Sequence, residues 1–163
     1  MLKQHRNLKM PVDISRATLP ELLNMVNKLP AKDRVAHLRE IANLKPDLKT
    51  VIMLTFHRDI QFDLPEGAPP FKALDIPNNW GYNRLPKELK KFKYFIKGSK
   101  NNLTNIRREK IFIDMLESIS IDEAKLAIMI KDKKLFGYKN INRKVAEEAL
   151  PELFVGESKS QNV

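Results

Sequence analysis

The chain has 163 residues, 42% of them apolar and 31% charged, which suits one globular domain with a substantial hydrophobic core. It holds no cysteine, which excludes disulfides, thiol catalysis and cysteine-bound metals, and no apolar run reaches the roughly 18–20 residues of a membrane span. The formal net charge is +10, and no apolar segment follows the basic N-terminus, so we expect a cytoplasmic protein without a signal peptide.

Three helices are predicted in the first third of the chain. Thr18 and Glu21 form a capping-box pattern ahead of apolar residues at helical spacing, and Pro30 ends this first helix. A second helix is predicted over about residues 31–44. Pro46 suits the first turn of a third helix, whose pattern breaks by residue 59.

Residues 59–85 are predicted to form a long irregular loop, because four prolines and two glycines interrupt any period. Pro86 restarts a helix that Gly98 closes. Three more helices are predicted: one over about 102–118, one that starts at the capping box of Ser120 and Glu123 and runs to about 130, and one over about 142–150.

These patterns predict an all-α fold, a single compact bundle of about seven helices with one long proline-rich loop. The predicted domain covers residues 15–155. A mobile basic arm precedes it at 1–14, and a flexible tail follows it at 156–163.

The sequence offers no pattern that supports catalysis. His5, His37 and His57 do not stand at metal-ligand spacing. The five glycines form no phosphate-binding loop, and no serine stands in a nucleophile-elbow pattern. Carboxylates are frequent but form no recognisable metal constellation for a nuclease. We therefore expect a protein that is not an enzyme and that holds no cofactor or metal.

Positive charge is gathered in two segments and an arm. Residues 84–113 hold ten basic and two acidic side chains, and residues 131–144 hold six and one. Residues 1–16 add a net +3, whereas residues 17–83 balance at zero. Such a distribution is typical of a nucleic-acid-binding face, and it is also typical of solvated helix faces. Both interpretations stay open on charge alone.

The segment 130–154 is the most informative part of the sequence about the class of ligand. Six basic residues surround Gly137 between two predicted helices, where several cations could meet a polyanion. Asn142 is the predicted N-cap of the last helix and would place free backbone N–H groups beside a phosphate. In the helix predicted over 87–97, lysines alternate with aromatic residues; Phe92 is expected in the core, and Tyr94 lies off the apolar face.

Residues 48–62 read LKTVIMLTFHRDIQF, and residues 131–137 read KDKKLFG ahead of an amphipathic run at 145–153. The first block resembles the third-helix region of the N-terminal α-helical DNA-binding domain of T4-type ATP-dependent DNA ligases. The second is similar to that domain's closing motif, an Arg-Asp-Leu-x-x-Gly-type turn that leads into a helix ending near Pro-x-Leu. Here two residues separate Asp132 from Leu135, which the ligase pattern has adjacent.

This resemblance covers residues 18–154, and residues 64–71, LPEGAPPF, also look like small proteins of T4-like myoviruses and cyanophages. It implies a non-catalytic protein of phage DNA metabolism, in the host cytoplasm, that grips duplex or nicked DNA through phosphates with weak sequence specificity. The expected phosphate-binding residues are those of the turn, Lys131, Lys133, Lys134, Lys139, Asn142, Arg143 and Lys144, and those of the basic helices, Lys90, Lys93, Lys97, Arg107 and Arg108.

An alternative is a protein-interaction module that uses the same scaffold to bind a phage replication or repair protein, or a host protein. Its contact would be the proline-rich loop over residues 64–80, through Phe71, Ile76 and Trp80. Trp80 and Tyr82 could also stack on a base, or Trp80 could pin the loop onto the body. No membrane partner is expected.

Overall fold

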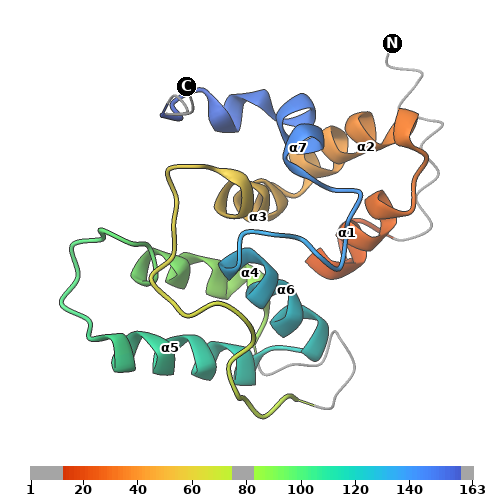
Figure 1. Ribbon diagram of the computed structural model, residues 1–163. Coiled ribbons are helices and arrows are strands. Elements are labelled where there is room, and N and C mark those ends of the chain that lie inside the picture. Colours follow the sequence, from red (N-terminus) through yellow and green to blue (C-terminus); the bar gives the residue numbers. More distant parts are fainter. Residues whose placement is uncertain (1–12, 75–82, 159–163) are drawn as a thin grey trace.

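A computed structural model of the chain describes residues 13–74 and 83–158. They form an all-α fold without a strand (Figure 1). Two isolated backbone bridges, Phe62 with Ile96 and Leu74 with Ser120, are the only extended pairings among them. The described elements are α1 (Leu19–Asn27), α2 (Ala31–Leu44), α3 (Pro46–Phe56), α4 (Leu85–Glu88), α5 (Asn105–Ser118), α6 (Ile121–Lys131) and α7 (Arg143–Ala149), with two 3₁₀ helices, η2 (Leu89–Tyr94) and η3 (Pro151–Phe154).

Three predicted helix N-caps are confirmed, whereas the helix predicted from about residue 102 begins at Asn105. Thr18, Ser120 and Asn142 each accept a hydrogen bond from the backbone N–H three residues further on, at 3.3, 3.3 and 3.0 Å. Each bond satisfies one of the N–H groups that the first helical turn leaves without a partner. The carboxylate of Glu123 also accepts the N–H of Leu85 at 2.9 Å, so one buried side chain joins the starts of α6 and α4.

The helix predicted over 86–97 differs in kind. Only α4 is an α-helix, and the chain continues as the 3₁₀ helix η2. Leu89, Phe92 and Phe95 are all buried, at a spacing of three residues. Side chains three apart lie above one another in a 3₁₀ helix, whereas an α-helix would turn the third one away from the core. The core therefore favours the tighter helix at this point.

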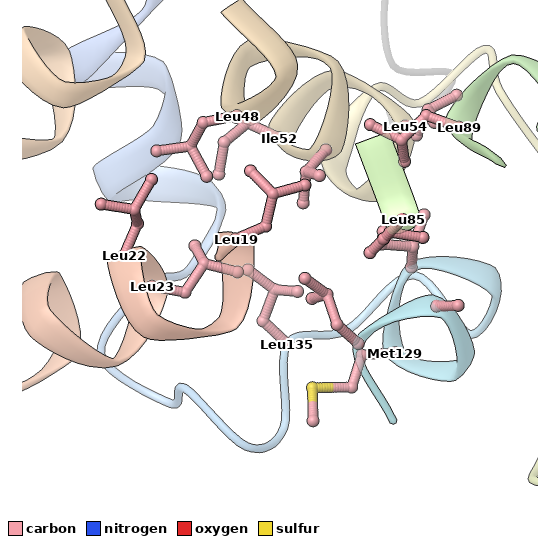
Figure 2. Close-up of a cluster of buried hydrophobic side chains, with 14 of the residues drawn as sticks. Leu19, Leu22, Leu23, Leu48, Ile52, Leu54, Leu85, Leu89, Met129 and Leu135 are labelled. Atoms are coloured by element: carbon pink, nitrogen blue, oxygen red, sulfur yellow. The ribbon is translucent and has the colours of Figure 1, made fainter. Parts of the chain in front are cut away.

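The two halves of the fold meet at α6. In Figure 1, α2, α3 and α7 lie above α6, whereas α5 lies below it. Helix α6 packs against α1, α3, α4 and α5, and α2 packs against α1, α3 and α7. Helix α6 is central to the fold, because nearly all of its residues from Glu123 to its end are buried. Figure 2 shows leucines of α1, Leu48 and Ile52 of α3, Leu85 of α4, Met129 and Leu135 in one cluster of buried side chains.

An aromatic cluster fills the space under η2 and α5. The rings of Phe62, Phe92, Phe95 and Phe112 meet edge to face, with centroids 5.4–6.4 Å apart. Such pairs add stability beyond the area they bury. Phe62 stands in the loop after α3, so the cluster also ties the first part of that loop to the lower half.

The loop after α3 crosses the body before α4. Phe71, a predicted contact of the interaction-module alternative, is half-buried against the core, and the N–H of Lys72 donates to the carboxylate of Glu117 at 2.7 Å. Only part of the Phe71 side chain is therefore open to a partner. Ile76, Trp80 and Tyr82, and the basic arm up to residue 12, lie outside the described residues.

The start of the predicted tail is joined to the body. The Glu157 carboxylate accepts the N–H of Arg58 at 2.7 Å, and the N–H of Ser158 donates to Asp59 at 2.9 Å. In the part of the chain that the structure describes, no helix is both long and apolar enough to cross a membrane.

Candidate nucleic-acid interface

The twelve residues predicted to contact phosphates fall into two groups in the structure. Four of the cations, Lys131, Lys133, Arg143 and Arg108, bind carbonyl and carboxylate oxygens of the protein itself. The other seven cations have exposed side chains: Lys134, Lys139, Lys144, Lys90, Lys93, Lys97 and Arg107. The remaining residue, Asn142, is engaged as the N-cap of α7. DNA contact by any of these residues stays a prediction, and the geometry of each decides what it is free to do.

Lys131, at the end of α6, points into the proline-rich loop. Its ammonium group donates to the carbonyl oxygens of Pro65 at 2.8 Å and Gly67 at 2.5 Å, and to the Asp132 carboxylate at 2.6 Å. The same carboxylate accepts the N–H of Gly67. A buried ammonium with three acceptors is well satisfied, and it has no hydrogen left for a phosphate.

Lys133 turns back toward α3. Its backbone has a φ of 63°, in the left-handed region, and its ammonium donates to the carbonyl oxygens of Leu54 at 2.9 Å and His57 at 2.8 Å. Burial lowers the pKa of this amine from 10.5 to about 8, and the nearby Arg143 guanidinium acts in the same direction. The charge stabilises the carbonyl end of α3, where a helix favours a cation.

Arg143, the first residue of α7, binds the same end of α3. Its guanidinium donates to the carbonyl of Phe56 and to the carboxylates of Glu157 and Glu147, and it lies 4.4 Å from the ring centroid of Phe154. Hydrogen bonds from Arg143 lower the pKa of Glu157 to about 2. The hydrogen bonds of Arg143 to Glu157 and Glu147 in turn raise the pKa of Arg143. Lys133 and Arg143 together cap α3 by tertiary contacts.

Arg108, on α5, is 8% exposed and joins three segments. Its guanidinium donates to the carbonyls of Tyr94 at 3.3 Å and Leu103 at 3.0 Å, and to the Asn105 side chain at 2.8 Å. Asp63 lies 3.5 Å away and completes an ion pair. The residue therefore fixes η2 and the loop before α5 on the body.

We define the turn surface as Lys134, Lys139 and Lys144. All three are exposed, and none forms an ion pair with another described residue. Phe136, beside them in sequence, is 53% exposed. Asn140 donates to the backbone carbonyl of Asn27 at 2.8 Å, so this turn lies against the end of α1, on the right in Figure 1.

We define the η2–α5 surface as Lys90, Lys93, Lys97 and Arg107. These side chains are exposed, and none forms an ion pair within the described residues. Of the two acidic residues in the segment 84–113, Glu88 is buried and paired with Lys91, and Glu109 is half-buried. The ammonium of Lys93 lies 5.2 Å from the ring centroid of Tyr94. The loop between η2 and α5 lies at the left edge of Figure 1.

Sequence reasoning missed the partners of the inward-facing cations. Lys131 pairs with its neighbour Asp132, but its bonds to the carbonyls of the proline-rich loop, and those of Lys133 to the end of α3, span 64 or more residues and carry no local signal. Glu157 comes from a segment predicted to be a tail. No group of three or more potential metal-ligating side chains occurs within residues 13–74 and 83–158.

The chain belongs to a family of unknown function, DUF6433, whose match covers residues 22–137. That span includes the whole η2–α5 surface and only Lys134 of the turn surface. No curated protein and no solved structure matches the chain.

Proposed function

We propose that this member of the DUF6433 family is a non-catalytic DNA-binding protein that grips phosphates through the η2–α5 surface. The observation that supports the proposal is the concentration of Lys90, Lys93, Lys97 and Arg107 without anionic partners among the described residues. Exposed cations of this kind displace the counterions condensed on DNA phosphates, and they bind any sequence with similar strength. The turn surface is a second, smaller contact. The ligase resemblance, with the likeness of residues 64–71 to small phage proteins, supports a place in phage DNA metabolism.

The test is a salt titration of DNA binding by fluorescence anisotropy. Each phosphate contact adds about 0.9 to the slope of log affinity against log salt. Replacement of all four residues of the η2–α5 surface by Gln therefore makes the slope shallower by about 3–4 and weakens binding at low salt. Binding that does not respond to salt between about 50 and 200 mM would contradict the proposal.

A charge-matched control separates a site from general attraction. Lys28, Lys32, Arg39 and Lys125 are exposed cations outside both surfaces, and their replacement by Gln removes the same charge. We expect this variant to keep most of the affinity and nearly the full slope. An equal loss in both variants would show that net charge, and no particular surface, attracts DNA.

A second candidate function is the protein-interaction module. It is supported by the rigid, exposed loop tip at Pro65 and Gly67, beside a hollow of about 190 Å³ that runs along the loop to Pro70. A loop tip that the body already holds in place loses little conformational entropy when a partner binds. A pull-down with and without nuclease distinguishes the two, because a single nuclease-resistant partner favours this candidate and partners lost on treatment favour DNA.

A further inference from the structure

A surface hollow of about 550 Å³ lies between η2 and the first half of α5. Its apolar lining comes from Tyr94, Leu103 and Ile111, and its polar lining includes Asn102, Arg107 and Asp114. Tyr94 is 37% exposed, whereas Leu103 and Ile111 are half-buried. Arg107 lines the hollow, and the ammonium of Lys93 lies over the Tyr94 ring, 5.2 Å from its centroid.

The walls of this hollow are held in place from beneath. Arg108 donates to the carbonyls of both Tyr94 and Leu103, so one buried guanidinium fixes the distance between the two walls. The Asn101 side chain binds Ser99 at 2.9 Å and accepts the N–H of Leu103 at 3.3 Å. A site whose backbone is already fixed loses little entropy when a ligand enters.

The lining matches one class of ligand group. An aromatic ring with two aliphatic side chains offers a flat apolar seat, and the amide of Asn102 and carboxylate of Asp114 offer hydrogen-bonding groups at its rim. Arg107 and Lys93 place positive charge next to that seat. A planar heterocycle with a hydrogen-bonding edge, attached to a phosphate, satisfies all three features, and this is the chemistry of a nucleotide in a strand.

We propose that the hollow takes one unpaired base of a DNA strand, which stacks on Tyr94 while the adjoining phosphates lie on Lys93 and Arg107. The inference rests on the proposed DNA binding and adds a preference to it. A base inside a duplex is stacked and paired, so it reaches the hollow only at the cost of leaving the helix. The protein should therefore prefer single-stranded or gapped DNA over intact duplex.

The experiment compares four probes. Fluorescence anisotropy measures binding of a short single strand, of the same strand with abasic sites throughout, and of the corresponding duplex. A free mononucleotide is tested as a competitor of the labelled single strand. The abasic strand keeps the phosphates and removes the bases. We expect the wild-type chain to bind the normal strand at least 5-fold more tightly than the abasic one, since base–aromatic stacking contributes about 1–3 kcal/mol. The mononucleotide should compete only weakly.

Two substitutions at one exposed position test the stacking contact. Tyr94→Leu should lose most of the preference for the normal strand and leave binding to the abasic strand unchanged, whereas Tyr94→Phe should retain the preference. Thermal unfolding checks that both variants fold, and Arg107→Gln should weaken the normal and abasic strands alike.

The outcomes separate this inference from the proposed function. Equal wild-type binding to normal and abasic strands overturns the base site and leaves phosphate binding intact. Mononucleotide competition as strong as that of the strand overturns the strand proposal in favour of a nucleotide site. The absence of binding to any of the four probes overturns both the inference and the proposed function.

Discussion

The ammonium group of Lys131 lies 2.8 Å from the carbonyl oxygen of Pro65, across 66 residues of chain. The same ammonium binds the carbonyl of Gly67, and the next residue, Asp132, accepts the Gly67 N–H through its carboxylate. The last residues of α6 and their neighbour thus hold both sides of the loop tip, with the Lys131 side chain only 2% exposed. A lysine that a charge count assigns to the surface acts here as an internal support.

Lys131→Met should destabilise the fold by about 3 kcal/mol, because it leaves two carbonyls and the Asp132 carboxylate without their buried partner. Lys134→Met, three residues further on and exposed, should change the free energy of unfolding by less than about 0.5 kcal/mol. Urea unfolding measures both values. Equal unfolding midpoints for the two variants would contradict the supporting role of Lys131.

In alkaline solution, the titrations of Lys133 and Tyr138 should change the free energy of unfolding in opposite directions. The pKa of Lys133 is about 8 in the folded chain and 10.5 ordinarily, so between these values the unfolded chain binds more protons and the free energy of unfolding rises with pH. Burial, with the Asp122 charge, raises the pKa of the Tyr138 phenol from 10.0 to about 12. Above pH 10 the folded chain therefore keeps a proton that the unfolded chain loses, and stability falls.

Denaturant unfolding between about pH 7 and 12 checks this expectation by difference. Relative to the wild type, Lys133→Met should lack the rise that begins near pH 8, and Tyr138→Phe should lack the fall above pH 10. The comparison cancels the titration of exposed lysines, which all three chains share. Curves that stay parallel across the whole range would show that neither group is linked to folding.

Acid stability should depend on Glu157. Its pKa is about 2 in the folded chain and 4.5 ordinarily, so its contribution is fully present above pH 4.5 and is lost as the pH falls toward 2. Glu157→Gln should lower the unfolding midpoint at pH 7 and flatten its decline between pH 4.5 and 2. Glu148→Gln, an exposed carboxylate on α7, is the control and should leave the decline as it is. If both variants give the same acid curve, the bridge to Arg143 adds no stability.

Two glycines offer a clean test of backbone strain. Gly98 has a φ of +83°, and a methyl group added at either Gly98 or Gly156 would meet nothing within 4 Å. Only Gly98 lies in the left-handed region, so Gly98→Ala should cost about 1–2 kcal/mol while Gly156→Ala is nearly neutral. Thermal unfolding distinguishes them, and a loss of similar size at both positions would point away from the φ angle.

Helix positions could be predicted because their signals are local. The N-caps at Thr18, Ser120 and Asn142, and Pro46 in the first turn of α3, lie within three residues of the groups they affect. The 3₁₀ form of η2 could not be read the same way, since its period is set by the aromatic cluster that Phe92 and Phe95 enter. That cluster includes Phe62 from a distant loop.

Which cations point inward and which stay exposed could not be predicted either, because this also depends on contacts between distant residues. Lys133 and Lys134 are neighbours of identical type, yet a φ of 63° at Lys133 turns its side chain onto the end of α3, and Lys134 stays in solvent. The seven exposed cations are among the twelve residues that the sequence predicts to contact phosphates. The hollow beside Tyr94 could not be predicted from the sequence, because it forms where Arg108 holds η2 against the loop before α5.

The bridge from Arg143 to Glu157 decides where the polypeptide can be shortened. The sequence predicts that the domain ends at residue 155. A cut after Val155 removes the Glu157 carboxylate, which binds both the guanidinium of Arg143 and the backbone N–H of Arg58. In such a fragment the N–H of Arg58 loses its acceptor, and the Arg143 guanidinium, which also binds the Phe56 carbonyl, loses its partner carboxylate. Any trimmed or fused version of the protein should therefore retain Ser158, and a tag belongs beyond it.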